Sequence, residues 1–290
     1  MNFENNKEKI AILADSCCDV PKEYVDKYDM FSVPLKVIYS NGEEYLDKIN
    51  ITSKEVIERF QEEIPKTSLP DAETVKLKYD EIKEAGYEKL IVITISSGLS
   101  GTNNLMRLVA SEYEGLEIKV IDTKNIGIGA GFFAIKAGML RDEGKSFEEI
   151  AIDLELSVPT TQIFFCVKTL EYLKKGGRIG LVSGTIGELL DLKPIISCNE
   201  DGIYHTVAKV RGRNKSLLKT LECAVNFGKD FNRYSIAIVE AGAEEEAKEL
   251  RVKLENMLPN AEIKLYGNLT PALVVHTGPG LIGIGVQKLG

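Results

Sequence analysis

The chain has 290 residues, of which 44% are hydrophobic and 28% charged, and its 36 Lys and Arg against 44 Asp and Glu give a formal net charge of −8. The hydrophobic fraction excludes an intrinsically disordered chain, the length predicts two domains, and the acidic balance disfavours a nucleic-acid partner. No apolar run approaches the ~18 residues that span a bilayer, and residues 1–7 lack the apolar core of a signal peptide, so we expect a cytoplasmic protein.

Alternating strand and helix patterns in the first half of the chain predict a parallel sheet. Short apolar runs, typical of strands buried on both faces, are separated by segments with helix start and stop signals. Helices between successive strands indicate βαβ crossovers, which make neighbouring strands parallel. The expected elements are strands at 9–14, 89–95 and 117–121, a hairpin of 33–39 with 43–46 around Asn41-Gly42, helices from Pro21, at 52–64, at 72–85 and ending near 112 and 142, and a loop at 66–71.

The second half predicts a domain with a mixed sheet. Ser157-Val158-Pro159 marks the expected boundary. The predicted fold class is therefore α/β with two α/β domains, residues 1–157 with a parallel sheet and residues 158–290 with a mixed sheet. The expected elements are strands at 161–167, 235–239, 262–265 and 273–275, an antiparallel pair of 194–197 with 202–207, and helices at 170–175 and 244–257.

The five cysteines do not indicate a metal or redox site. Cys17 and Cys18 are adjacent, the other three are scattered, and no C-x-x-C pair occurs, so neither a zinc site nor a dithiol is expected. We expect reduced and mostly buried thiols, no metal and no cofactor.

The loop at residues 96–102, Ser-Ser-Gly-Leu-Ser-Gly-Thr, is the most informative segment and is called the serine loop below. It joins a buried strand to a helix at the carboxyl end of the predicted parallel sheet, which is where such sheets bind ligands. Backbone N–H groups at the helix start, two glycines and several hydroxyls can together hold a carboxylate or a phosphate. The same residue types also occur in strand-to-helix turns that bind nothing.

One histidine and two basic groups are further candidates. His276 follows the apolar run 273–275 and precedes a Gly-Pro-Gly turn, so its imidazole either donates to an anion, acts as a base or is structural. His205 is expected to be structural. Arg178 and Arg211 belong to two basic groups that form a positive patch if they meet in space, and ordinary solvated surface if they do not.

A second class of function, a serine hydrolase or acyltransferase, would pair Ser97 or Ser100 with His276 and orient the imidazole with Asp15 or Asp122. The serine loop lacks both the Gly-x-Ser-x-Gly spacing of a hydrolase elbow and the Lys of a P-loop, which disfavours this alternative. A third class, an enzyme acting on small anions or sugar phosphates, would need a metal or strong cation that the sequence does not clearly show.

Five segments together resemble the DegV family, the fatty-acid-binding proteins that serve bacterial fatty acid kinase. Each segment is a weak sign alone, and the five in this order over essentially the whole chain make the resemblance strong. They are Asp15-Ser16-Cys17-Cys18-Asp19, Thr67-Ser68-Leu69-Pro70, Ser96-Ser97-Gly98-Leu99-Ser100-Gly101-Thr102, Gly177-Arg178-Ile179 and His276-Thr277-Gly278-Pro279-Gly280.

The resemblance implies a binding protein without catalytic residues, in which a long-chain fatty acid lies between the two domains. Hydroxyls of the Thr67-Ser68 segment and of the serine loop would hold the carboxylate. Ser97 is the first choice within that loop. The family usually has Gln where this chain has Leu69, which puts the details of head-group recognition in doubt. The implied carboxylate-binding residues are Thr67, Ser68, Ser96, Ser97, Gly98 and His276.

The resemblance also implies a partner. The bound carboxylate would be presented to a separate ATP-dependent kinase subunit that makes acyl phosphate, with Arg178 and Arg211 on the surface that faces this partner. Transient contact with a membrane surface is compatible with that role.

A fatty acid tail needs an apolar channel. At ~0.8 kcal/mol per buried methylene, a tail of about fifteen methylenes gains roughly 12 kcal/mol before ordering costs. The expected walls are residues 126–137, Phe164-Phe165 and residues 186–195.

Overall fold

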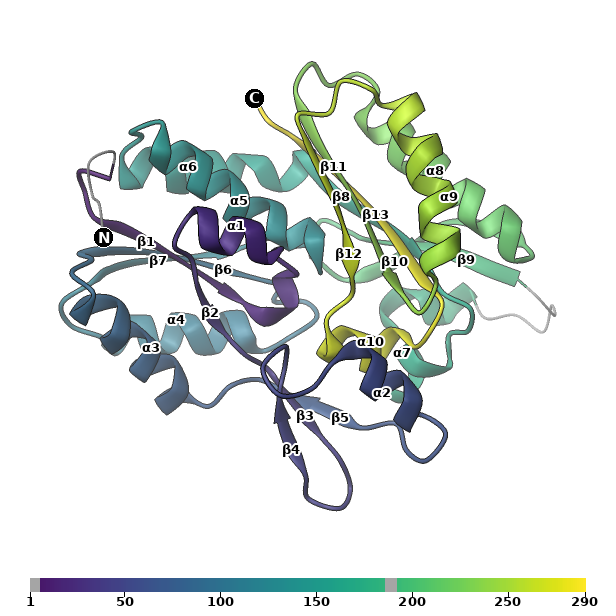
Figure 1. Cartoon of the computed structure of the whole chain (residues 1–290), viewed down its shortest axis with the longest axis horizontal. Coiled ribbons are helices and arrows are strands. Elements are labelled where there is room, and N and C mark those ends of the chain that lie inside the picture. Colours follow the sequence, from purple (N-terminus) through teal and green to yellow (C-terminus); the bar gives the residue numbers. More distant parts are fainter. Residues whose placement is uncertain (1–5, 186–191) are drawn as a thin grey trace.

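The computed structural model describes residues 6–185 and 192–290, which form three sheets and the helices that cover them (Figure 1). The elements of the first half are β1 (Ile10–Asp15), η1 (Ser16–Cys18), α1 (Lys22–Lys27), β2 (Phe31–Val33), β3 (Lys36–Ile38), β4 (Glu44–Leu46), α2 (Ser53–Arg59), β5 (Lys66–Ser68), α3 (Ala72–Glu84), β6 (Lys89–Thr94), α4 (Thr102–Glu112), β7 (Glu117–Asp122), α5 (Ile128–Asp142) and α6 (Phe147–Ser157). The elements of the second half are η2 (Val158–Thr160), β8 (Thr161–Cys166), α7 (Glu171–Lys175), η3 (Gly180–Thr185), β9 (Leu192–Cys198), β10 (Tyr204–Arg211), α8 (Arg213–Gly228), β11 (Tyr234–Ala241), α9 (Glu244–Met257), β12 (Ile263–Asn268), α10 (Pro271–Thr277) and β13 (Leu281–Lys288).

A four-stranded parallel sheet organises the first half, in the order β2-β1-β6-β7. β1 is buried along its whole length and pairs in parallel with β2 and β6, for example Ile12 with Ile91. α3 and α4 cover one face of this sheet, and α5 and α6 cover the other (Figure 1). The predicted parallel sheet is confirmed, although the three residues of β2 gave no sequence signal.

A six-stranded mixed sheet organises the second half, in the order β10-β9-β8-β13-β11-β12. β13 is antiparallel to β8 and β11, whereas β11 and β12 are parallel. α8 and α9 pack on its outer face (Figure 1). The predicted mixed sheet is confirmed, and β13 was not anticipated because Gly283 and Gly285 interrupt its apolar pattern.

The helix α5 lies between the parallel sheet and the mixed sheet. All of its residues from 128 to 138 are buried, and it contacts β1 and β6 on one side and β8, β11 and β13 on the other. Glycines allow the close approach: a Cβ on Gly131 would lie 2.2 Å from the carbonyl oxygen of Cys18, and one on Gly138 would lie 2.5 Å from the Tyr28 ring. The two halves share a core through this helix, and the boundary at residue 157 stays a prediction.

A small antiparallel sheet, β4-β3-β5, contacts α10 of the second half through β3 and β5 (Figure 1). The hairpin predicted around Asn41-Gly42 is confirmed, because β3 and β4 pair across it. The loop predicted at 66–71 is wrong in its first half, since Lys66–Ser68 is the strand β5. Thr67 lies opposite Val37 of β3, so this strand depends on a partner about thirty residues away that local sequence does not reveal.

The strand predicted at 273–275 is also wrong, because Pro271–Thr277 is the helix α10. Pro271 occupies the first turn and Gly278, with φ of 70°, ends the helix. Every residue of α10 except His276 is buried, so its apolar run fits a buried helix as well as a buried strand.

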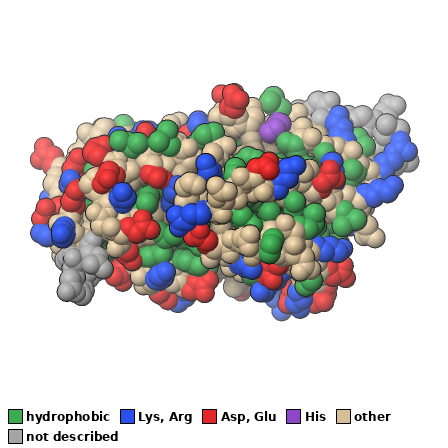
Figure 2. Space-filling view, turned by 90° about the horizontal axis from the view of Figure 1, so that it is seen from above, with side chains coloured by type: hydrophobic (Ala, Val, Ile, Leu, Met, Phe, Trp, Pro, Cys, Tyr) green, Lys and Arg blue, Asp and Glu red, His purple; other side chains and the backbone are tan. Residues whose placement is uncertain are grey.

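Acidic and basic side chains are interspersed over the face of the molecule shown in Figure 2, with apolar side chains between them. Within residues 6–185 and 192–290, no helix combines the length and the apolar character needed to cross a membrane. The apolar helix α5 has 15 residues and is covered by protein on both sides.

Replacing Gly131 with Ala is expected to lower the free energy of unfolding by about 1–3 kcal/mol, because the added Cβ collides with a backbone oxygen. Gly267→Ala in β12 is the control, since nothing lies within 4 Å of its added Cβ, and we expect a change within about 0.5 kcal/mol. Denaturant unfolding measures both variants. Equal stability of the two would contradict the packing of α5.

Candidate functional site

Thr67 and His276, which are 209 residues apart in sequence, meet in the structure. Thr67 Oγ1 lies 2.7 Å from His276 Nε2. Thr67 is the central residue of β5, and His276 lies in the last turn of α10. Two of the expected carboxylate-binding residues are therefore brought together.

The imidazole of His276 is neutral at physiological pH. Burial, and secondarily the positive charge of Arg178, lowers its pKa from 6.5 to about 4. Its buried Nδ1 has no hydrogen-bond partner among the residues that the structure describes, and a Cβ on Gly176 would lie 2.1 Å from this nitrogen. Nε2 is therefore the ring nitrogen that is available for polar contacts.

A cavity of about 40 Å³ adjoins this pair. Thr67, His276 and Ser100 are part of its wall, and most of the remaining wall is apolar. The exposed Arg178 lines it too, and its guanidinium donates to the carbonyl oxygens of Leu99 at 3.3 Å and Gly176 at 2.9 Å. The cavity therefore has uncharged hydroxyl and imidazole groups inside and a cation toward solvent.

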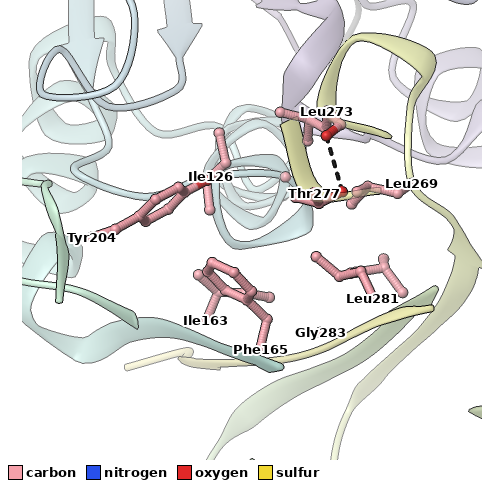
Figure 3. A pocket seen from close by; sticks show the side chains of 11 residues that line it. Ile126, Ile163, Phe165, Tyr204, Leu269, Leu273, Thr277, Leu281 and Gly283 are labelled. Atoms are coloured by element: carbon pink, nitrogen blue, oxygen red, sulfur yellow. Dashed lines mark hydrogen bonds between the residues drawn. The ribbon is translucent and has the colours of Figure 1, made fainter. Parts of the chain in front are cut away.

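A second cavity, of about 20 Å³, is lined almost entirely by apolar groups. Figure 3 shows Phe165 and Ile163 of β8 facing it from one side and Leu273 of α10 from the other. The hydroxyl of Thr277 donates to the carbonyl oxygen of Leu273 at 3.0 Å, so its proton is already used in a hydrogen bond within α10. The lining is of the apolar kind that a hydrocarbon chain contacts.

The two cavities adjoin each other. Four residues, Ile126, Tyr204, Leu273 and Thr277, line both of them. Gly127, the residue just before α5, lines the apolar cavity, so the space lies between the two sheets at the start of this helix. The polar cavity at Thr67 and His276 and the apolar cavity are therefore neighbours that share part of their walls.

Ser100 is the serine of the serine loop that lines the cavity, whereas Ser97 lines neither cavity. Ser97 Oγ donates to Asp122 Oδ2 at 2.5 Å and accepts from Lys124 Nζ at 3.1 Å. A contact between Ser97 and a carboxylate therefore stays a prediction. Ser100 was not among the expected ligand residues, because the curvature of the loop decides which serine faces inward, and no motif encodes that curvature.

Ser96 and Gly98 make contacts within the fold. Ser96 is fully buried, and its Oγ accepts a hydrogen bond from the Gly98 N–H at 3.1 Å. A Cβ on Gly98 would lie 2.9 Å from the carbonyl oxygen of Asp201, and one on Gly202 would lie 1.9 Å from Ser96 Oγ. The absence of a side chain on Gly98 thus admits the turn between β9 and β10, and a role of Gly98 in carboxylate binding stays a prediction.

Ser68 adjoins Thr67, but its hydroxyl donates to the carbonyl oxygen of Leu69 at 3.1 Å. Leu69 is partly exposed beside the serine loop, where its side chain would lie 3.5 Å from a Cβ on Gly101. The position of Leu69 places an apolar group at the rim of the site.

Arg178 and Arg211 are both exposed, and the structure does not place them in one patch. The turn after Arg178 packs on Tyr204 at the start of β10, whereas Arg211 ends that strand, about 20 Å further along. Arg213, in the second basic group, is paired with Glu246. A kinase-facing role for Arg178 and Arg211 stays a prediction.

The hydrolase alternative requires contacts that the structure does not make. His276 Nε2 faces Thr67, and its buried Nδ1 has no partner, so no acid orients the imidazole. Asp15 accepts from the backbone N–H groups of Cys17 and Ile95, and Asp122 accepts from Ser97. A Ser-His-Asp triad is therefore not assembled among these residues.

The expected channel walls are partly correct. Ile126 and Phe165 line the apolar cavity, whereas Phe164 packs on the other face of β8 against Phe227. The part of the third wall at residues 186–191 lies outside the described residues. Leu281 and Gly283 of β13 were missed, although alternating glycines in an apolar run indicate a close approach at the sheet face.

A family model described as "Uncharacterised protein, DegV family" matches residues 9–289. The chain belongs to the DegV family. A DegV domain-containing protein of Clostridium perfringens is 41% identical over 281 residues, which cover 97% of this chain and 99% of that protein. The resemblance inferred from the five sequence segments is confirmed.

Solved DegV structures share the fold. A DegV family protein of Thermus thermophilus, described as fatty acid binding, superposes with a TM-score of 0.91 at 30% identity, covering 97% of this chain and 100% of that one. A stearic-acid-binding protein of Eubacterium ventriosum superposes with a TM-score of 0.86 at 30% identity, covering 97% and 98%. DegV of Bacillus subtilis, described as a fatty acid binding protein, gives 0.89 at 27% identity, covering 97% and 100%.

His276 is expected to titrate with a pKa near 4 and to be neutral at pH 7. Because the folded pKa lies below the ordinary value, the unfolded chain binds more protons between pH 6.5 and pH 4, and stability is lost as the pH falls through this window. Nitrogen-15 NMR of the imidazole measures the pKa, with His276→Gln to assign the signal. A titration near pH 6.5 would show that the ring is solvated.

Proposed function

We propose that this DegV protein binds a long-chain fatty acid between the parallel sheet and the mixed sheet, and that it presents the carboxylate to a separate ATP-dependent kinase. The observation that carries the proposal is the apolar cavity that adjoins a polar end formed by Thr67 and His276. The relatives from Thermus thermophilus, Bacillus subtilis and Eubacterium ventriosum, which are described as fatty-acid-binding proteins, support the same ligand class.

The polar end suits a carboxyl group. Thr67 Oγ1 and a protonated Nε2 of His276 are both potential donors to a carboxylate oxygen, and Ser100 adds a hydroxyl on the same wall. Because the imidazole is neutral, the site does not neutralise the ligand with a full counter-charge. The same groups can therefore bind a carboxylate, a protonated acid or an acyl phosphate.

The apolar end supplies most of the affinity. Each methylene that leaves water contributes ~0.8 kcal/mol, whereas a hydrogen bond to a charged group contributes about 1.5–3 kcal/mol. A long acyl tail therefore outweighs the head group in binding energy, and the head-group contacts set the orientation of the chain. Fatty acids with short tails should bind weakly at this site.

The kinase role rests on access to the carboxylate. Arg178 lies beside the polar end and is exposed, so a partner that approaches this mouth meets a cation next to the bound head group. Ser68 follows Thr67 in β5, and Arg178 donates to Leu99 of the serine loop. Contacts of Ser68 and Ser97 with the carboxylate are part of this proposal. We place the exchange in the cytoplasm, where the acyl chain would be collected through transient contact with a membrane surface.

Protein purified from a bacterial host is expected to carry fatty acid, which mass spectrometry of a solvent extract detects.

Thr67→Val should weaken fatty acid binding about tenfold to a hundredfold, because the head group loses a donor. Thr160→Val is the matched control, since Thr160 is also partly buried, its hydroxyl donates to the carbonyl oxygen of Ser157, and it lines neither cavity. Equal affinity of the two variants would overturn the head-group site.

Arg211→Ala is expected to slow acyl phosphate formation by the kinase several-fold while the bound lipid content stays unchanged, because Arg211 lines neither cavity. A coupled assay with the purified kinase and ATP measures the rate. Loss of lipid from this variant would contradict a surface role, and an unchanged rate would remove Arg211 from the partner-facing surface.

A further inference from the structure

The contact between Thr67 and His276 depends on how α10 is held against the small sheet β4-β3-β5. Thr67 belongs to this sheet, and His276 belongs to α10. The two elements pack through β3, β5 and α2, with no covalent link closer than the long chain between them. Contacts between α10 and the residues around the small sheet must therefore hold the helix in position.

Asp47 is the side chain best placed to do this. It directly follows β4 and is fully buried, and its backbone N–H donates to the carbonyl oxygen of Leu35 at 2.9 Å. Its carboxylate accepts from Thr270 Oγ1 at 2.7 Å and from the backbone N–H of Ala272 at 2.9 Å. Both oxygens of one buried carboxylate thus bind the start of α10.

Because α10 is a short helix, fixing its first turn also fixes the position of His276 in its last turn. Ala272 and His276 are four residues apart, which is about one turn, so they lie on the same face of α10. Both residues line the polar cavity. Because α10 has only seven residues, fixing the N–H of Ala272 sets the direction in which the imidazole points.

Further contacts beside Asp47 hold the same end of α10. The backbone N–H of Thr270 donates to Asp19 Oδ1 at 3.1 Å, and Lys48 Nζ lies 3.5 Å from the same oxygen. Asp19 and Lys48 both have positive φ angles, 52° and 64°, a conformation that non-glycine residues adopt only when their surroundings hold them. The hydroxyl of Ser53 also donates to the carbonyl oxygen of Leu269.

We infer that Asp47 is a positioning residue for the fatty acid carboxylate: it anchors the first turn of α10 to the β4-β3-β5 sheet so that His276 meets Thr67. This inference rests on the proposed function for its ligand, but the geometry it describes exists without ligand. Asp47 itself does not line either of the two cavities.

The main test is Asp47→Ala. It is expected to weaken binding of a fluorescent long-chain fatty acid at least tenfold and to raise the pKa of His276 from about 4 toward 6.5, because the imidazole loses its buried position. Ser146→Ala is the control for general loss of stability, since it removes the capping box of the remote helix α6. That variant should change neither readout.

Two further variants keep the inference falsifiable. Asp47→Asn retains an acceptor for the Ala272 N–H and can donate to the Thr270 hydroxyl, so it should rescue most of both effects. Thr270→Val removes one of the two hydrogen bonds and should shift both readouts in the same direction by a smaller amount, even if Asp47→Ala does not fold. A folded Asp47→Ala or Thr270→Val protein with wild-type affinity and an unchanged His276 pKa would overturn the inference.

The two readouts separate this inference from the proposed function. The pKa of His276 is measured in the protein without lipid, so it reports on the anchor alone. If the wild-type protein binds no fatty acid, the proposed function fails, and a rise in the His276 pKa in Asp47→Ala still supports the anchor.

Discussion

The burial of α5 by both sheets is the constraint on which the rest of the molecule depends. A helix packed between two sheets needs small residues where its neighbours approach closely: Gly131 faces the carbonyl oxygen of Cys18, and Gly138 faces the ring of Tyr28. The apolar cavity lies where this helix begins, at Ile126 and Gly127, and residues of the mixed sheet form another part of its wall. The location of this cavity is therefore tied to the helix that the two halves share.

The polar end of this space combines neutrality with restraint. Burial lowers the pKa of His276, so the imidazole approaches a ligand as a neutral hydrogen-bonding group and not as a cation. Under the proposed function, a neutral site would favour transfer of the carboxylate to another protein, since strong ion pairing would hold the carboxylate more tightly. In that proposal, the tail supplies most of the affinity, and the head group stays accessible.

Local sequence patterns predicted the elements that local interactions stabilise. The strand β6 and the start of helix α2 after Thr52 were found this way, because apolar runs and helix start signals act over a few residues. β5 and α10 were mispredicted, because pairing with β3 stabilises β5, and the burial of every α10 residue except His276 gives that helix the apolar run of a buried strand. Thr67 and His276 were identified from family motifs and do meet, whereas the choice among the serines depended on loop curvature that only the folded chain defines.

The glycine beneath His276 has a consequence for proton exchange. Gly176 packs against the Nδ1 side of the ring so closely that no side chain fits between them, and that nitrogen has no partner. Nε2 is therefore the ring nitrogen that can exchange a proton, and it does so on the side of Thr67. In such a site, the protonation state of Nε2 is coupled to the ionisation of a molecule that occupies the cavity.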